Sequence, residues 1–230
     1  MFLGIYMSTP TQKLWGSIED VFSAILNHPF IRGLTTGDLS VEAFKYYVIQ
    51  DYLYLRDFSR ALSRLASRSR DEDLILMFSE HAKTAIEVEK SLHKSFLSEW
   101  GLGEKEVARI PPSPINYAYT SHLLRTVAEE SYEEAVASVL PCYWIYLEVG
   151  KHLEKKGSPN PLYKRWIDTY SSTTYENIVK IVLNAADKIL YRVREKLWED
   201  VVRSFRISSI YEYLFWDSAY RLEKWVFSIL

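Results

Sequence analysis

Apolar positions recur every three or four residues over long stretches of the chain, with polar residues between them. This spacing places the apolar side chains on one face of an α-helix. A clear example is the face that carries Phe44, Tyr47, Tyr54, Phe58 and Leu62. No stretch shows the sustained alternation of apolar and polar residues that is typical of β-hairpins. The pattern therefore predicts an all-α helical bundle.

Capping residues, glycines and prolines mark the predicted helix ends. Thr9 before Pro10 and Ser40 before Val41 are typical of helix N-termini. A segment at 28–33 and a turn through 36–38 connect the first two helices. The predicted helices cover about residues 10–27, 41–69, 71–100, 113–128, 132–156, 161–170, 174–197 and 199–228. We expect one domain over residues 1–230, of which residues 1–8 are a short extension.

The amino-acid composition and the net charge indicate which classes of protein the chain can belong to. The chain holds 17 Tyr, 10 Phe and 7 Trp, and tyrosine at this frequency favours interiors where ring faces pack and hydroxyls find partners. The net charge of -2 offers no basic field for nucleic acid. No window of 18 uncharged apolar residues predicts a membrane span. A single cysteine excludes an internal disulfide and fits a reducing compartment, so we expect a cytoplasmic protein.

The only cysteine, Cys142, lies inside the predicted helix 132–156, directly after Pro141. Pro141 has no N–H to donate to the carbonyl of Ala137, so a kink is expected there. One interpretation is that this bend turns the thiol into a cavity, with Tyr146 one turn away on the same face. The other is that Cys142 is a small buried apolar residue, as free cysteines usually are.

Two carboxylates interrupt aromatic stripes in the same way. Asp51 lies near Tyr54 on the second predicted helix, and Glu212 lies near Phe215 on the last. Asp51 is either a core carboxylate bonded to a neighbouring helix or an acid that anchors a ligand. A bundle can bring three such helices around one cavity. Two carboxylates and a thiol among aromatic walls could then carry out nucleophilic and acid/base chemistry on a flat ring.

These positions also carry a family resemblance. The run Gln50-Asp51-Tyr52-Leu53-Tyr54, Cys142 with Tyr146, Tyr170 before two serines, and YEYLFWDSAY at 211–220 resemble the TenA (thiaminase II) family. The order and spacing of these motifs match along nearly the whole chain. The resemblance implies the haem-oxygenase-like all-α fold and a homotetramer.

The activity implied by the resemblance is that of an aminopyrimidine aminohydrolase. Such enzymes convert 4-amino-5-aminomethyl-2-methylpyrimidine to the hydroxymethyl pyrimidine and ammonia in thiamin salvage, and many also cleave thiamin. The partner implied is thus a small molecule, an aminopyrimidine or thiamin. No metal or organic cofactor is needed.

The resemblance also assigns roles to residues. Cys142 would be the nucleophile that adds to the pyrimidine ring, and Asp51 would bind the amino group and the adjacent ring nitrogen. Glu212 would protonate the opposite ring nitrogen and later help to activate water. A carboxylic acid in an apolar pocket has a raised pKa and can keep that proton near neutral pH. The residues expected to line the substrate pocket are Tyr54, Tyr119, Tyr146, Tyr170 and Phe215.

A metal-dependent oxygenase with the same fold is one alternative. Glu89 and His93 are four residues apart on one predicted helix, and Glu148 and His152 are four apart on another. Di-iron bundles instead use a spacing of three, with further carboxylates from two more helices. The lysines near both pairs are typical of solvated helix faces.

A non-catalytic pyrimidine-binding or regulatory protein is the other alternative. Such a protein would keep Asp51 and the aromatic walls but would not need Cys142. The presence of the cysteine favours catalysis. His81 and His122 are assigned no role, because lone histidines on helices are more often packed or exposed.

Overall fold

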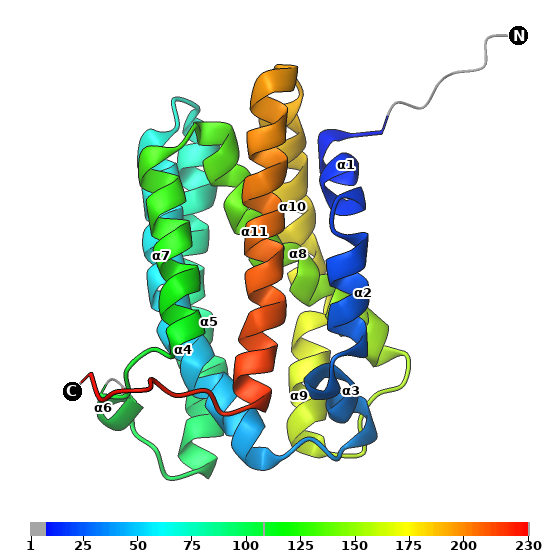
Figure 1. Cartoon of the computed structure of the whole chain (residues 1–230), viewed down its shortest axis with the longest axis vertical. Helices are drawn as coiled ribbons and strands as arrows, with labels where there is room; N and C mark the ends of the chain where they lie inside the picture. The colour runs from blue at the N-terminus through cyan, green and yellow to red at the C-terminus, as the bar shows by residue number, and fades with distance from the viewer. Residues whose placement is uncertain (1–7, 108, 230) are drawn as a thin grey trace, which may run out of the picture.

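The computed structural model describes residues 8–107 and 109–229, and within helices the side chains of residues 88–94 and 104 lie outside that description. Over these ranges the regular structure is helical throughout, so the predicted all-α class is confirmed (Figure 1). The helices are α1 Pro10–Gly16, α2 Glu19–Asn27, α3 Pro29–Thr36, α4 Val41–Arg68, α5 Glu72–Glu99, α6 Glu104–Val107, α7 Pro114–Glu129, α8 Tyr132–Glu154, α9 Pro161–Tyr170, α10 Thr173–Leu190 and α11 Glu195–Tyr220. Residues 1–7 of the expected extension are outside the described residues.

The N-terminal part differs from the prediction. The single helix expected at 10–27 is divided into α1 and α2, and the expected connector at 28–33 is helical, as part of α3. His28 caps α3, because its Nδ1 accepts a hydrogen bond from the backbone N–H of Phe30 at 3.1 Å. Pro29 occupies the first helical position, where it fits a helix and does not interrupt one.

Helices α10 and α11 also begin and end at other residues than predicted. Ser172, and not Thr174, caps α10, which ends at Leu190 rather than near 197. The last helix begins at Glu195 and ends at Tyr220, eight residues before the predicted end at 228. Beyond it, Leu222 adopts a left-handed φ of 53°, which does not continue a helix. The chain then crosses the lower edge of the bundle as the red segment of Figure 1.

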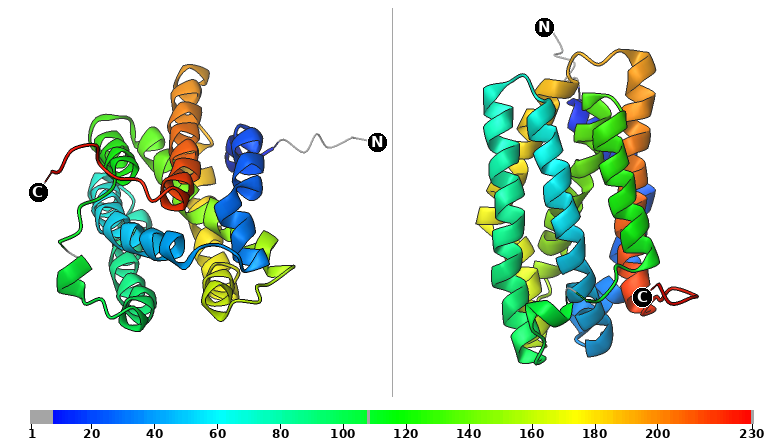
Figure 2. Two further views of the ribbon diagram at one scale, coloured as in Figure 1. Left: turned by 60° about the horizontal axis from the view of Figure 1, so that its bottom comes forward. Right: turned by 90° about the vertical axis from the view of Figure 1, so that its left-hand side faces the viewer.

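The long helices α4, α5, α7 and α11 run roughly along the long axis of the molecule (Figure 2). Helix α4 packs against α5, and α11 packs against α8. Helix α8 also contacts α4, α7, α9 and α10, so it is surrounded by other helices. Residues 135–141 of α8 are buried accordingly, and Cys142, which follows them, is half-buried.

One glycine sets how closely α9 approaches α8. A Cβ at Gly150 would lie 2.6 Å from the backbone carbonyl carbon of Tyr170, nearer than any real Cβ contact. Glycine therefore lets the end of α9 rest directly on α8. This contact holds the ring of Tyr170 with its centroid 4.9 Å from that of Tyr146.

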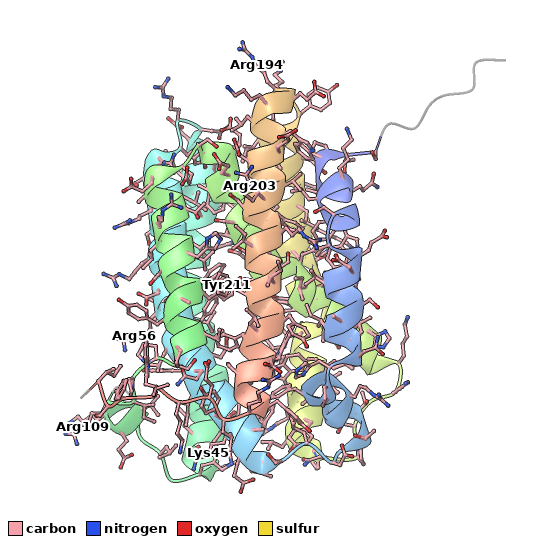
Figure 3. All side chains as sticks on the ribbon, viewed as in Figure 1. Lys45, Arg56, Arg109, Arg194, Arg203 and Tyr211 are labelled. Carbon is pink, nitrogen blue, oxygen red and sulfur yellow. The ribbon has the colours of Figure 1, made fainter. Side chains whose placement is uncertain are left out.

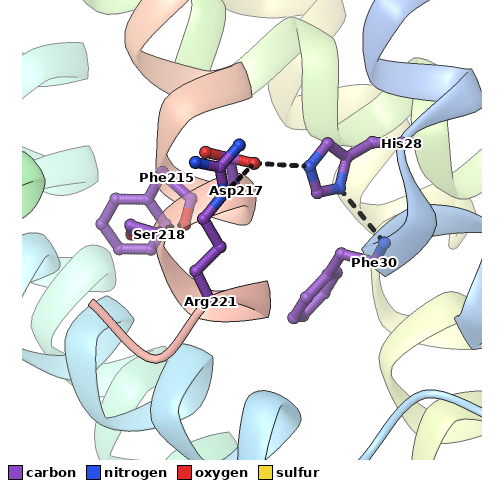
Figure 4. Close-up of polar contacts among 6 residues, drawn as sticks. All are labelled: His28, Phe30, Phe215, Asp217, Ser218 and Arg221. Atoms are coloured by element: carbon purple, nitrogen blue, oxygen red, sulfur yellow. Dashed lines mark hydrogen bonds and ion pairs between the residues drawn. The ribbon is translucent and has the colours of Figure 1, made fainter.

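A buried histidine joins the N-terminal helices to α11 (Figure 4). Because Nδ1 of His28 accepts from Phe30, its neutral ring carries the proton on Nε2, which donates to Asp217 Oδ1 at 3.2 Å. Burial lowers the pKa of His28, which keeps this form at neutral pH. Arg221 Nε lies 3.1 Å from the same carboxylate oxygen. Together these contacts fix the C-terminal turns of α11, the helix that carries Glu212.

Candidate active site

A cavity of about 260 Å³ lies among five helices, α4, α5, α8, α9 and α10. Its lining is Asp51, Leu55, Phe58, Glu80, His81, Thr84, Ala85, Cys142, Tyr143, Tyr146, Tyr170, Tyr175 and Ile178. The wall is mostly aromatic and aliphatic, with few polar groups, as in small-molecule sites. Its volume suits one flat ring with a substituent.

Four of the predicted site residues line this cavity: Asp51, Cys142, Tyr146 and Tyr170. We call these four residues the inner end. They come from three different helices, and Asp51 and Tyr146 are almost fully buried. The structure thus brings the thiol and one predicted carboxylate to the same space.

The other four predicted residues form a buried layer that adjoins the inner end. Tyr119 donates a hydrogen bond from its hydroxyl to Glu212 Oε1 at 2.7 Å. The ring centroid of Tyr54 lies 5.0 Å from that of Tyr119 and 5.7 Å from that of Phe215. Tyr119 of α7 also stacks on Tyr211 of α11, which is labelled in Figure 3, with ring centroids 5.2 Å apart.

Glu212 is the group whose acidity the fold changes most clearly. Burial raises its pKa to about 8, and the neighbouring charge of Asp51 acts in the same direction, while the hydrogen bond from Tyr119 opposes the rise. At neutral pH the side chain is therefore a neutral carboxylic acid that can give up a proton. This is the protonation state expected of a general acid.

A chain of hydrogen bonds runs from the buried side chain of Trp166 through Tyr47 to Tyr146 of the inner end. The indole Nε1 of Trp166, which can only donate, donates to the hydroxyl of Tyr47 at 3.2 Å. Tyr47 in turn donates to the hydroxyl of Tyr146 at 3.3 Å. Because Tyr146 accepts this bond, its own hydroxyl proton is directed elsewhere. Burial raises the pKa of Tyr47 and of Tyr146 well above 10, so both stay protonated.

Tyr175, which sequence reasoning missed, supports the cysteine through the backbone. Its hydroxyl donates to the carbonyl oxygens of Cys142 at 3.3 Å and Tyr143 at 3.1 Å. These carbonyls belong to the turn that presents the thiol. Tyr175 follows the Ser-Ser turn after Tyr170, but nothing in its local spacing distinguishes it from a packing residue.

The part of the cavity wall that α5 forms was also missed. Glu80, His81 and Thr84 on α5 supply its polar groups, and we call these three residues the outer wall. His81, which the sequence left without a role, has Nδ1 3.2 Å from the hydroxyl of Tyr143. The Glu80 side chain is 63% exposed, so this side of the cavity lies near solvent.

A second hollow, of about 320 Å³, lies beneath the C-terminal segment. Tyr46, Gln50, Glu223 and Trp225 are among its lining residues, but none of the predicted catalytic residues is. Of the predicted catalytic residues, Asp51 and Cys142 line the other cavity.

The Glu/His pairs considered for a metal have different positions. The side chains of Glu89 and His93 are outside the described residues, and His152 is exposed on α8 near Glu148. In the part of the chain with described side chains, no three histidine, cysteine or acidic residues gather closely enough to hold a metal ion.

The helices of the described ranges include none that is long and apolar enough to span a membrane.

Comparison with known proteins agrees with this arrangement. Residues 15–222 match the TENA/THI-4/PQQC family. The chain belongs to this family. It is 37% identical over 198 residues to the aminopyrimidine aminohydrolase of Bacillus subtilis, covering 86% of this chain and 84% of that protein. The resemblance found in the sequence motifs is therefore confirmed.

Solved structures show the fold of this TENA/THI-4/PQQC protein. A TenA homologue from P. horikoshii OT3 superimposes with a TM-score of 0.85 at 29% identity, covering 93% of this chain and 99% of that one. A domain with a heme oxygenase-like fold from Shewanella denitrificans gives a TM-score of 0.72 at 14% identity, covering 94% of each chain. The predicted haem-oxygenase-like fold is confirmed.

Proposed function

We propose that this chain is an aminopyrimidine aminohydrolase of thiamin salvage that hydrolyses 4-amino-5-aminomethyl-2-methylpyrimidine and, as a second substrate, thiamin. The observation that carries the proposal is the shared cavity of Cys142 and Asp51, beside a Glu212 that is protonated at neutral pH. The relative from Bacillus subtilis that bears this enzyme name supports the reaction class.

In the proposed mechanism, Asp51 binds the amino group and adjacent nitrogen of the pyrimidine. Glu212 gives its proton to the opposite ring nitrogen, which makes the ring electrophilic enough for the Cys142 sulfur to add to a ring carbon. The electron pair gained by the ring then expels the amine from the methylene carbon as ammonia, which takes up the proton that the Cys142 thiol loses on addition. Water, deprotonated by Glu212, adds to that carbon, and the sulfur leaves with the proton of the ring nitrogen as the aromatic ring is restored.

The tyrosines hold the ring and the sulfur in place. Tyr146 and Tyr170 meet at the inner end with ring planes 53° apart, so a flat ring can contact the face of one and the edge of the other. The Tyr146 hydroxyl proton, which is not used in its bond with Tyr47, can be donated to the thiolate or the substrate. Fixed contacts of this kind bring the reacting atoms together before the chemistry begins.

The test is to measure hydroxymethyl pyrimidine and ammonia formed from the aminomethyl pyrimidine by wild type and by Cys142→Ser, with and without a chelator. We expect turnover by wild type, no effect of the chelator, and a loss of about 100-fold or more for the serine variant. Equal rates for both proteins would reduce Cys142 to a packing residue. Binding without turnover would favour the binding-protein alternative, and loss of activity with chelator would favour a metal enzyme.

We further propose a homotetramer that works in the cytoplasm as one helical domain. Val226 and Phe227 in the C-terminal segment are 90% and 82% exposed, and such apolar side chains favour contact with another subunit. Nucleic acid is not a proposed partner, since the net charge is -2 and the basic residues labelled in Figure 3 are spread over separate parts of the surface. Light scattering of the purified protein would measure the assembly.

A further inference from the structure

In the mechanism proposed above, the residues of the inner end bind and convert the substrate, but the outer wall of Glu80, His81 and Thr84 has no role. Glu80, His81 and Thr84 lie on one face of α5, since residues three and four apart on a helix are neighbours. All three line the same cavity as Cys142. A substrate whose ring lies between Asp51 and Cys142 therefore has polar groups of α5 within the same small space.

His81 is held in place at this wall. Its Nδ1 lies 3.2 Å from the hydroxyl of Tyr143, the residue after the cysteine, and the two ring centroids are 5.7 Å apart. Burial lowers the pKa of His81, although the charge of Glu80 acts against this, so the ring is neutral at pH 7. A neutral imidazole does not repel a cation, and in the tautomer whose Nδ1–H donates to Tyr143 its Nε2 can accept a hydrogen bond from an ammonium group.

Glu80 adds a negative charge at the open side. Its only described ion pair is with Lys83, at 3.5 Å, and both side chains are more than half exposed. Exposed pairs of this kind are weak, so the Glu80 carboxylate is able to pair with a different cation. The wall thus combines a carboxylate, a neutral nitrogen and the hydroxyl of Thr84.

The substrates of the proposed reaction carry a matching charge. The aminomethyl group is a primary ammonium at neutral pH, and the thiazole of thiamin is a quaternary cation. In both cases the positive charge lies on the group that leaves. The hydroxymethyl product has no such charge.

We propose that Glu80, His81 and Thr84 form a subsite that recognises the positively charged leaving group of the substrate. This inference rests on the proposed function, and it adds a specificity determinant that is separate from the groups that carry out the chemistry. The subsite favours the cationic substrate over the neutral product, and so it favours product release.

The experiment compares wild type, Glu80→Gln and Glu87→Gln. Glu87 is a matched control, because it lies on the same helix, is 61% exposed, and pairs with the same Lys83 at 4.0 Å without lining the cavity. Three quantities are measured for each protein: KM and kcat for the aminomethyl pyrimidine, and the competitive inhibition constant of the neutral hydroxymethyl pyrimidine.

For Glu80→Gln we expect KM of the cationic substrate to rise about threefold to tenfold, with kcat and the inhibition constant changed less than about twofold. Glu87→Gln should match wild type in all three values. If Glu80→Gln leaves KM unchanged, or alters substrate and product equally, the subsite is refuted while turnover by wild type upholds the proposed function. If wild type does not turn over the substrate, both proposals fall.

Discussion

The inner end and the outer wall of the cavity are built in opposite ways. The inner end gathers Asp51, Cys142, Tyr146 and Tyr170 from three helices, behind which lie tyrosines with fixed hydrogen bonds. The outer wall comes from one helix, α5, and its Glu80 is largely exposed. The difference is clearest at Asp51 and Tyr146, which are almost fully buried, and at Glu80, whose side chain is 63% exposed.

This difference follows from what each region has to do. Glu212, behind the inner end, keeps its proton at neutral pH because it is buried, and burial on this scale requires packing from several helices. Recognition of a leaving group requires access to solvent, because that group must depart. Solvent also weakens each contact there. Substitutions behind the inner end should thus affect the chemical step, and those in the outer wall should affect binding.

The largest effect is expected from Glu212→Gln, which keeps the shape of the side chain but removes its transferable proton. Loss of a general acid typically costs about 100-fold to 10,000-fold in rate, so kcat should fall at least 100-fold with a small change in KM. Steady-state kinetics with the aminomethyl pyrimidine measure this. A variant with normal kcat would show that the chemistry does not depend on this acid.

A smaller effect is expected from Gly150→Ala, because the new methyl group would overlap the backbone of Tyr170. Overpacking costs about 1–3 kcal/mol, and the better helix propensity of alanine returns up to about 1 kcal/mol. We expect a Tm lower by about 2–6 °C and a raised KM, because Tyr170 is displaced. Thermal unfolding and kinetics measure both.

Gly16→Ala is the matched control for this change, since a Cβ at Gly16 meets no atom within 4 Å. It should leave Tm and KM close to those of wild type. Equal behaviour of the two alanine variants would mean that α8 and α9 can separate without cost, which would contradict the rigid inner end.

The smallest effect is expected from Tyr119→Phe. It is measured as a change in how kcat/KM depends on pH. Glu212 acts while protonated, so kcat/KM of wild type should be level near neutral pH and fall as pH rises through about 8. The hydrogen bond from Tyr119 stabilises the charged carboxylate and lowers the pKa of Glu212. Its removal should shift the alkaline limb to higher pH, with less than about a tenfold change at pH 7. A shift to lower pH would contradict the assigned cause.

Sequence reasoning found the inner end because its residues break a pattern. Asp51 and Cys142 are polar or reactive groups in aromatic stripes, and their spacing matches a family motif. The outer wall breaks no pattern, since Glu80 and His81 are ordinary residues for the polar side of an amphipathic helix. Only the packing of α5 against α4 turns them toward the cavity, and no local signal encodes that packing.

The helices of the fold, like the residues of the cavity, were predicted only in part. Long periodic helices such as α4 and α8 were found nearly to the residue, because their apolar faces are continuous. Helix α3 was missed, because the segment 28–33 was expected to be a connector although Pro29 begins a helix there. The end of α11 was missed because the left-handed Leu222 has no marker such as glycine.

The direction of the hydroxyl chain behind the cavity has a consequence for proton conduction. A row of hydroxyls alone can reverse all its bonds together and pass a proton along, as a proton wire does. Here the row starts at the indole of Trp166, which can donate but cannot accept, so the row of Tyr47 and Tyr146 cannot reverse. Protons therefore do not enter the inner end from Trp166.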